Sequence, residues 1–117
     1  MQWQDVRAGP LTFSFAERRL FRDRAQLREF LRSVGARRSP SVDFATRQLL
    51  FLSPGPRSST GYGIDVVGVS RQGDEITVRV RERAPGLEDH VAPRVTYPYR
   101  LISLPAGSEV FVDWVGR

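Results

Sequence analysis

The apolar residues of this chain recur with helical spacing in one stretch and alternate with polar residues in several others. Within residues 24–34 four apolar side chains fall at i, i+3, i+4 and i+7, which places them on one face of a helix. They are Leu27, Phe30, Leu31 and Val34. Asp23 is a preferred N-cap and Gly35 a preferred stop. The pattern therefore predicts one N-terminal amphipathic helix.

Alternation of apolar and polar residues predicts strands in the rest of the chain. The clearest case is Glu75–Arg83, where Ile76, Val78 and Val80 point to one side of the strand. A turn at residues 72–74 would join it to the strand before as a hairpin. Pro98 interrupts another apolar stretch, so we place that strand at a sheet edge. The expected strands are residues 11–15, 42–52, 61–70, 75–83, 95–104 and 110–114.

One helix and six strands, most of them joined as hairpins, predict an α+β fold. We expect a single domain over residues 1–117, mainly antiparallel β-sheet. A chain of 117 residues with 40% apolar residues has enough material for a hydrophobic core. The longest apolar run, residues 49–52, is too short to span a membrane, and the sequence begins without the apolar region of a signal peptide.

All the basic residues of the chain, apart from one histidine, are arginines. There are 18 arginines and no lysine, and the net charge is +5. Residues 1–57 carry a net +6 and residues 58–117 a net −1, so an acidic partner would be drawn to the N-terminal half. An outward row of Arg79, Arg81 and Arg83, or a helical row of Arg24, Arg28 and Arg32, could follow nucleic-acid phosphates. No nucleic-acid-binding motif accompanies these rows, so we favour a protein partner.

The residue types needed for catalysis are scarce. The chain has no cysteine and a single histidine, His90, placed in a loop. A nucleophilic serine would need a histidine base held by a carboxylate, and a phosphate-binding Walker loop would need a lysine. Glu75 and Glu82 are interpreted as solvated charges. We therefore expect no enzyme activity, no catalytic residue, no metal site and no cofactor.

Two short segments stand out as candidate partner-binding sites. Ser59, Thr60, Gly61 and Tyr62 form a turn that follows the stiff sequence Pro-Gly-Pro. Tyr97, Pro98 and Tyr99 place two tyrosines on one side of a strand. Tyrosine offers a large, stiff contact surface with a polar end. Two interpretations stay open for each segment, because the same tyrosines could instead pack into the core and the glycines could serve only the backbone.

The order of these motifs resembles the C-terminal domain of PrcB, a polypeptide associated with a bacterial protease complex. The resemblance covers about residues 11–112. It rests on Val42-Asp43-Phe44, Ser59-Thr60-Gly61-Tyr62, Ala84-Pro85-Gly86, Thr96-Tyr97-Pro98-Tyr99 and Leu104-Pro105. It implies a domain that binds and stabilises a protease. It also implies secretion or attachment to the cell envelope, whereas this chain shows no signal peptide or lipobox cysteine, so the compartment stays open.

The Ser59–Tyr62 turn is also similar to one inhibitory loop of chagasin-like inhibitors of cysteine peptidases. The other two loops of that family are matched only loosely, by residues 86–93 and 97–99. We therefore predict a non-enzymatic domain that binds a protein, with a protease complex as the expected partner. A chagasin-like inhibitor and a basic nucleic-acid-binding module are the alternatives.

Overall fold

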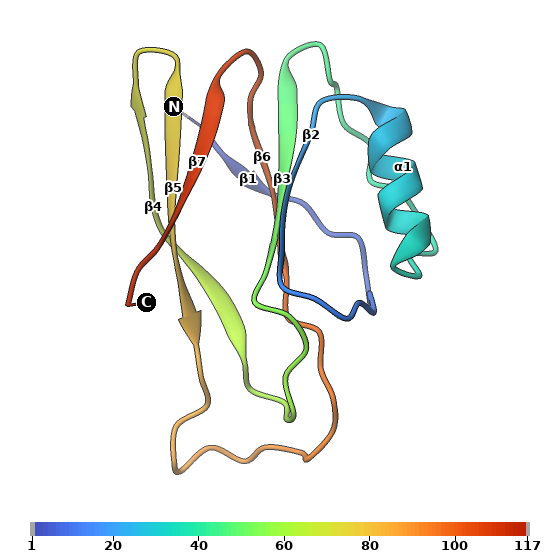
Figure 1. The fold of residues 1–117 in the computed structure, drawn as a ribbon, viewed down its shortest axis with the longest axis vertical. Coiled ribbons are helices and arrows are strands. Elements are labelled where there is room, and N and C mark those ends of the chain that lie inside the picture. The colour runs from blue at the N-terminus through green and yellow to red at the C-terminus, as the bar shows by residue number, and fades with distance from the viewer. Residues whose placement is uncertain (1, 117) are drawn as a thin grey trace.

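The computed structural model describes residues 2–116, in which seven strands and one helix form three layers (Figure 1). In chain order the elements are β1 (Gln4–Asp5), β2 (Glu17–Phe21), α1 (Arg24–Ser33), β3 (Arg47–Ser53), β4 (Gly63–Gln72), β5 (Glu75–Arg83), β6 (Arg100–Pro105) and β7 (Glu109–Trp114). From left to right, Figure 1 shows a three-stranded sheet, a four-stranded sheet and the helix.

The strands form two separate sheets. The four-stranded sheet has the order β1-β6-β3-β2, and all its neighbours are antiparallel. The three-stranded sheet has the order β4-β5-β7, in which β4 and β5 form an antiparallel hairpin. The β5–β7 pair is parallel. The prediction of a mainly antiparallel β structure with one helix is confirmed, with this pair as the exception.

Strand β3 is the centre of the protein, because it is buried on both faces. Leu49 and Phe51 face the helix, while Leu50 and Leu52 face the three-stranded sheet. β6 divides its side chains in the same way between the two cores. The strict alternation of a strand thus lets one sheet supply both cores, which joins the three layers into one globule.

Helix α1 forms where the sequence predicts it. The Asp23 side chain caps its first turn by accepting a hydrogen bond from the Gln26 backbone N–H at 2.8 Å. Three of its apolar side chains are buried against the four-stranded sheet, which is the middle of the three layers and is called the middle sheet below: Leu27, Phe30 and Leu31. Figure 1 shows the helix along one side of that sheet only. Within the described residues, no helix has the length and apolar character needed to cross a bilayer.

One strand predicted near the N-terminus is absent, and the next predicted strand is present but begins later than expected. Residues 11–15 are irregular, and the Thr12 N–H bonds to the Val34 carbonyl at the end of the helix, 2.9 Å away. The strand expected over residues 42–52 begins only at Arg47, because residues 43–46 form a turn in which the Asp43 carbonyl accepts a bond from the Arg47 N–H at 2.9 Å. Strand β2 pairs with β3 instead. The sequence of β2, Glu-Arg-Arg-Leu-Phe, has three charged residues in a row and so lacks the alternation that predicts a strand.

The strand expected over residues 95–104 is also corrected. Residues 95–99 lie outside any strand, and β6 begins at Arg100. β6 is also not an edge strand, since β1 and β3 flank it. Pro98 therefore precedes the strand, and the sheet edge is formed by the two-residue strand β1.

Candidate functional site

Two long connections meet at one end of the molecule and form what we call the loop end, residues 54–62 and 84–99. The first joins β3 to β4 and the second joins β5 to β6. Figure 1 shows both at the lower end of the ribbon. All seven candidate binding residues lie in the loop end, so the fold brings together the two segments that the sequence singled out.

Backbone hydrogen bonds fasten the two connections to each other. Arg57 and Thr96 exchange a reciprocal pair, with N···O distances of 2.9 and 2.8 Å. Further along, the Thr60 N–H donates to the Ala92 carbonyl at 3.1 Å, and the Ala92 N–H donates to the Thr60 hydroxyl at 2.8 Å. The loops are thus cross-linked like short strands although neither continues a sheet.

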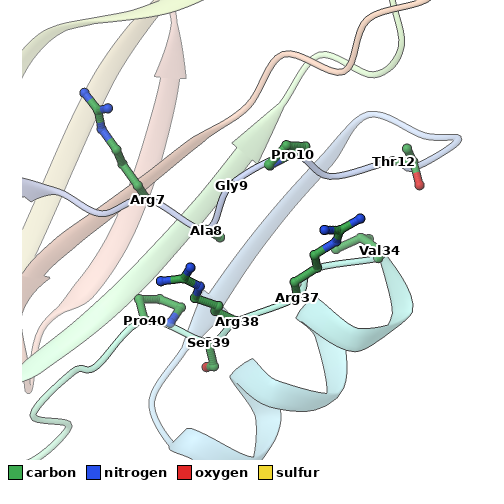
Figure 2. A pocket seen from close by; sticks show the side chains of 11 residues that line it. Arg7, Ala8, Gly9, Pro10, Thr12, Val34, Arg37, Arg38, Ser39 and Pro40 are labelled. Carbon is green, nitrogen blue, oxygen red and sulfur yellow. The ribbon is translucent and has the colours of Figure 1, made fainter.

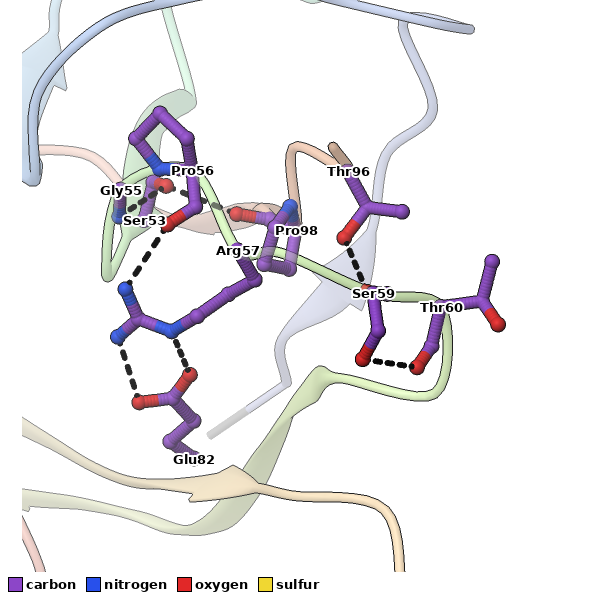
Figure 3. Close-up of polar contacts among 9 residues, drawn as sticks. All are labelled: Ser53, Gly55, Pro56, Arg57, Ser59, Thr60, Glu82, Thr96 and Pro98. Carbon is purple, nitrogen blue, oxygen red and sulfur yellow. Dashed lines mark hydrogen bonds and ion pairs between the residues drawn. The ribbon is translucent and has the colours of Figure 1, made fainter. Parts of the chain in front are cut away.

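Side chains add further links at the same place (Figure 3). The Thr96 hydroxyl donates to the Ser59 carbonyl at 2.8 Å, and the Ser53 hydroxyl donates to the Pro98 carbonyl at 2.8 Å. Ser59 and Thr60 therefore contribute mainly to the internal structure of the loop end. The structure places both half-buried.

Gly61 allows the two connections to approach each other. Its φ is +97°, a left-handed conformation that side chains with a Cβ rarely adopt. A Cβ at this position would lie 2.8 Å from the Pro85 Cβ and 3.2 Å from a Val91 methyl group. A larger residue here would push the second connection away, so Gly61 sets the spacing of the loop end.

Tyr62 lies beside a charged pair beneath the loop end. The Arg57 guanidinium is 5.9 Å from the centre of the Tyr62 ring, within the range of a cation–π contact. The same guanidinium binds both carboxylate oxygens of Glu82, at 2.6 and 2.8 Å. Glu82 is thus paired and only 19% exposed, which corrects the interpretation of Glu82 as a solvated charge.

The contact with Glu82 favours the protonated, charged form of Arg57. Hydrogen bonding to Glu82 raises the pKa of Arg57 above its ordinary value, and the nearby charges of Glu82 and Tyr62 act in the same direction. Desolvation opposes this shift only in part. Arg57 therefore stays charged and holds the first connection onto β5.

The two other tyrosines pack toward the core on the helix side. The Tyr97 ring meets Phe13 edge-on, with centroids 5.6 Å apart. The Tyr99 ring stacks on Phe51 at 5.5 Å, and its hydroxyl donates to the Gly9 carbonyl at 2.7 Å. Both tyrosines are half-buried, as is Pro98 between them. Tyr99 in particular joins the N-terminal segment to the middle sheet.

The loop end also carries apolar side chains that remain in water. Leu87 is fully exposed, Val95 is 60% exposed and Val91 is 42% exposed. Phe15, on the loop before β2, is 74% exposed, and its backbone lies against Gly55. None of these four is among the candidate binding residues named from the sequence. Their sequence signature is weak, because single apolar residues in a charged loop show no periodicity.

The second connection of the loop end also carries one histidine and two carboxylates. His90 is exposed on the 84–99 connection, beside Glu88 and Asp89. Asp89 is engaged with the backbone, since its carboxylate accepts a hydrogen bond from the Gly86 N–H at 2.6 Å. Over residues 2–116, no group of three or more histidine, cysteine, aspartate or glutamate side chains is positioned to hold a metal ion.

One family model matches a part of the chain that includes the loop end. Residues 49–105 match the PrcB C-terminal family. The PrcB C-terminal segment runs from β3 to the end of β6 and contains the whole loop end. It is shorter than the resemblance over residues 11–112, leaving out α1 and the Val42-Asp43-Phe44 motif. Searches of curated proteins and of solved structures found no match.

Proposed function

We propose that this protein is a non-enzymatic binding domain that stabilises or assists a partner protein, and that the partner is a protease complex. One observation carries the proposal: Leu87 is fully exposed on a connection that hydrogen bonds hold in place. Exposed apolar side chains that gather on one surface mark a site of protein contact. The PrcB C-terminal segment contains this surface and supports a protease complex as the partner.

The mechanism we propose is surface complementarity on a preorganised loop end. The exposed side chains of Leu87, Val91 and Val95 on the second connection would lose water on contact. Because the two connections are already fastened together, binding would order few additional residues. A smaller entropy loss leaves more of the contact free energy as affinity.

The absence of catalysis is part of the same proposal. The chain has no cysteine and no lysine, and His90 is its one histidine, the residue type that most often serves as a general acid or base. Its side chain is exposed to solvent on the second connection. We expect His90→Ala to leave both partner stabilisation and the unfolding midpoint unchanged. An activity abolished by His90→Ala would overturn the non-enzymatic assignment.

The test is affinity capture from a lysate of the source organism, followed by mass spectrometry. The tagged protein is compared with Leu87→Asp and with the control Phe111→Asp, which changes a 46%-exposed residue on β7. We expect a protease subunit with the wild type and the control, and its loss with Leu87→Asp. Unfolding midpoints should show that all three proteins are folded, because both substituted side chains are exposed.

Two outcomes would redirect or refute the proposal. If Leu87→Asp captures the protease as well as the wild type, the contact lies elsewhere in the loop end. Tyr62→Ala and Tyr97→Ala would then be tested for lost protection of the co-expressed protease at an unchanged midpoint. If no protease is captured by any of the proteins, the proposed partner class is wrong.

A peptidase inhibitor is the second candidate function. The observation that favours it is the meeting of the Ser59–Tyr62 turn with residues 86–93 and 97–99 at one end of two packed sheets. Inhibition by loops would need such a cluster. The experiment is a titration of a papain-type cysteine peptidase with the protein. Full residual activity at a large molar excess would exclude this function for that class of peptidase.

A further inference from the structure

A pocket of about 790 Å³ lies away from the loop end, between the N-terminal segment and the chain that leaves helix α1 (Figure 2). One wall is formed by residues 7–12 and the other by residues 34–40. In Figure 2 the side chains of Arg37 and Arg38 extend from the second wall toward the first. Arg7 stands on the first wall, with its guanidinium directed outward.

The lining of this pocket is basic and contains no carboxylate. Arg37 and Arg38 contribute its charged groups, whereas Arg7 lines the pocket with its guanidinium directed outward. Two smaller pockets differ, since Arg19 in one pairs with Glu17 and Arg100 in the other pairs with Asp5. Over residues 2–116, none of the three arginines of the large pocket forms an ion pair.

The walls of the pocket are fixed by hydrogen bonds although its arginines are exposed. The Tyr99 hydroxyl accepts from the Ala8 N–H at 3.3 Å and donates to the Gly9 carbonyl at 2.7 Å, which ties the first wall to the core. The Thr12 N–H donates to the Val34 carbonyl at 2.9 Å, which ties the first wall to the second. The space between the walls therefore exists before any ligand arrives, and only the side chains must adjust.

We propose that this pocket binds a small molecule that carries an oxyanion group, phosphate or carboxylate, next to an apolar part. Guanidinium groups present paired N–H donors whose geometry matches these oxyanions. Pro10, Val34 and Pro40 supply the apolar lining. A volume of about 790 Å³ is within the range of small-molecule sites. The site is independent of the proposed partner contact, because Leu87 and its neighbours take no part in it.

The test is an NMR titration of the ¹⁵N-labelled full chain with phenyl phosphate. We expect the largest shift changes at the backbone amides of Gly9, Thr12 and Gly35. Phenol reports on the apolar part alone and inorganic phosphate on the anion alone, and both should bind more weakly than phenyl phosphate. Benzoate distinguishes the carboxylate form of the ligand from the phosphate form.

Matched variants separate a site from general attraction to a basic protein. Arg37→Gln/Arg38→Gln removes two charges from the pocket, and the control Arg24→Gln/Arg28→Gln removes two exposed charges from helix α1. Loss of charge-assisted hydrogen bonds should weaken phenyl phosphate binding by about tenfold or more in the pocket variant. Loss of long-range attraction alone should weaken it by less than about twofold in the control.

Three results would overturn the inference. They are equal weakening in the two double variants, shift changes spread over all the arginine-rich faces, and no saturable binding of phenyl phosphate or benzoate at millimolar concentration. Unfolding midpoints of both variants should equal that of the wild type, because all four substituted side chains are exposed. Confined shifts with a selective loss in Arg37→Gln/Arg38→Gln would establish the site.

Discussion

Arg57 and Glu82 form a two-pronged ion pair between the β3–β4 connection and strand β5, with N···O distances of 2.6 and 2.8 Å. The two side chains are 26% and 19% exposed, so water screens the pair less than it screens the surface pairs of this protein. The guanidinium of the pair also lies 5.9 Å from the centre of the Tyr62 ring, so the pair links the loop end to strand β5 beside this candidate binding residue.

Replacing one partner of this pair should therefore destabilise the protein. We expect Glu82→Gln to lower the free energy of unfolding by about 1.5–3 kcal/mol, the usual range for hydrogen bonds to a charged group. The matched control is Asp113→Asn, which breaks the half-exposed Arg79–Asp113 pair and should cost no more than about 1 kcal/mol. Chemical denaturation of both variants measures the difference. Equal losses would show that the Arg57–Glu82 pair has no special weight.

The pH dependence of this contribution follows from the raised pKa of Arg57. A raised pKa in the folded state stabilises the protein at every pH where the guanidinium is protonated, and this stabilisation is lost only as the pH rises through the pKa of Arg57 in the folded state, far above the physiological range. Between about pH 6 and pH 10, the wild type and Glu82→Gln should differ by a constant free energy. A difference that shrinks steadily across this range would contradict the assignment.

The core beneath the helix predicts a large effect at Phe30. The centroid of its ring lies 4.8 Å from that of Phe51 and 5.2 Å from that of Phe21, and Phe30 is 5% exposed. Phe30→Ala should cost about 3–5 kcal/mol. Phe15→Ala, which removes the same atoms from a 74%-exposed site, should change stability by less than about 0.5 kcal/mol. An unchanged denaturation midpoint for Phe30→Ala would mean that the helix does not pack as described.

Tyr99 offers a test of a single hydroxyl. Tyr99→Phe keeps the ring stacked on Phe51 but removes the hydrogen bonds to Ala8 and Gly9, at a cost of about 1 kcal/mol. Tyr97→Phe is the control, because within residues 2–116 the Tyr97 hydroxyl makes no hydrogen bond. Faster hydrogen exchange at the Ala8 amide in Tyr99→Phe alone would locate the effect. Similar behaviour of the two variants would show that the hydroxyl does not hold the N-terminal segment.

The arginine row on β5 should not bind nucleic acid tightly. Arg79 pairs with Asp113 and Arg83 pairs with Asp65, so part of the positive charge is neutralised within the sheet. Titration with single-stranded and duplex oligonucleotides should give weak association that falls steeply with salt. Sub-micromolar binding at physiological salt would favour the nucleic-acid alternative over a protein partner.

The elements predicted well are those whose evidence is local. The Asp23 cap and the 3.6-residue period define α1, and alternation over Glu75–Arg83 gives β5 with its boundaries. The division into two sheets and the parallel β5–β7 pair could not be predicted, because they depend on contacts between segments far apart in sequence. Residues 95–99 show an apolar pattern, but their backbone bonds are made to a loop.

The loop end shows the same limit. The turn at Ser59–Tyr62 is visible in the sequence, because Gly61 supplies a backbone angle that few residues adopt. The partner of Arg57 is not visible in the sequence, because Glu82 is 25 residues away. Glu82 also occupies a polar position of an alternating strand, where a charged residue is normally solvated. The exposure of Leu87 is likewise a property of the folded loop, which no neighbouring residue reveals.

The parallel pairing of β5 with β7 also has a consequence for the order of folding. After β5 the chain leaves the three-stranded sheet and forms β6 in the middle sheet. Only then does it return to the three-stranded sheet as β7. The buried Gln48 side chain fastens this return, donating to the Pro105 and Ser108 carbonyls at 2.8 and 3.1 Å. Such distant pairings slow folding to the range of about milliseconds to seconds. A nascent chain that has not yet reached β7 leaves one edge of β5 open to pairing with another chain.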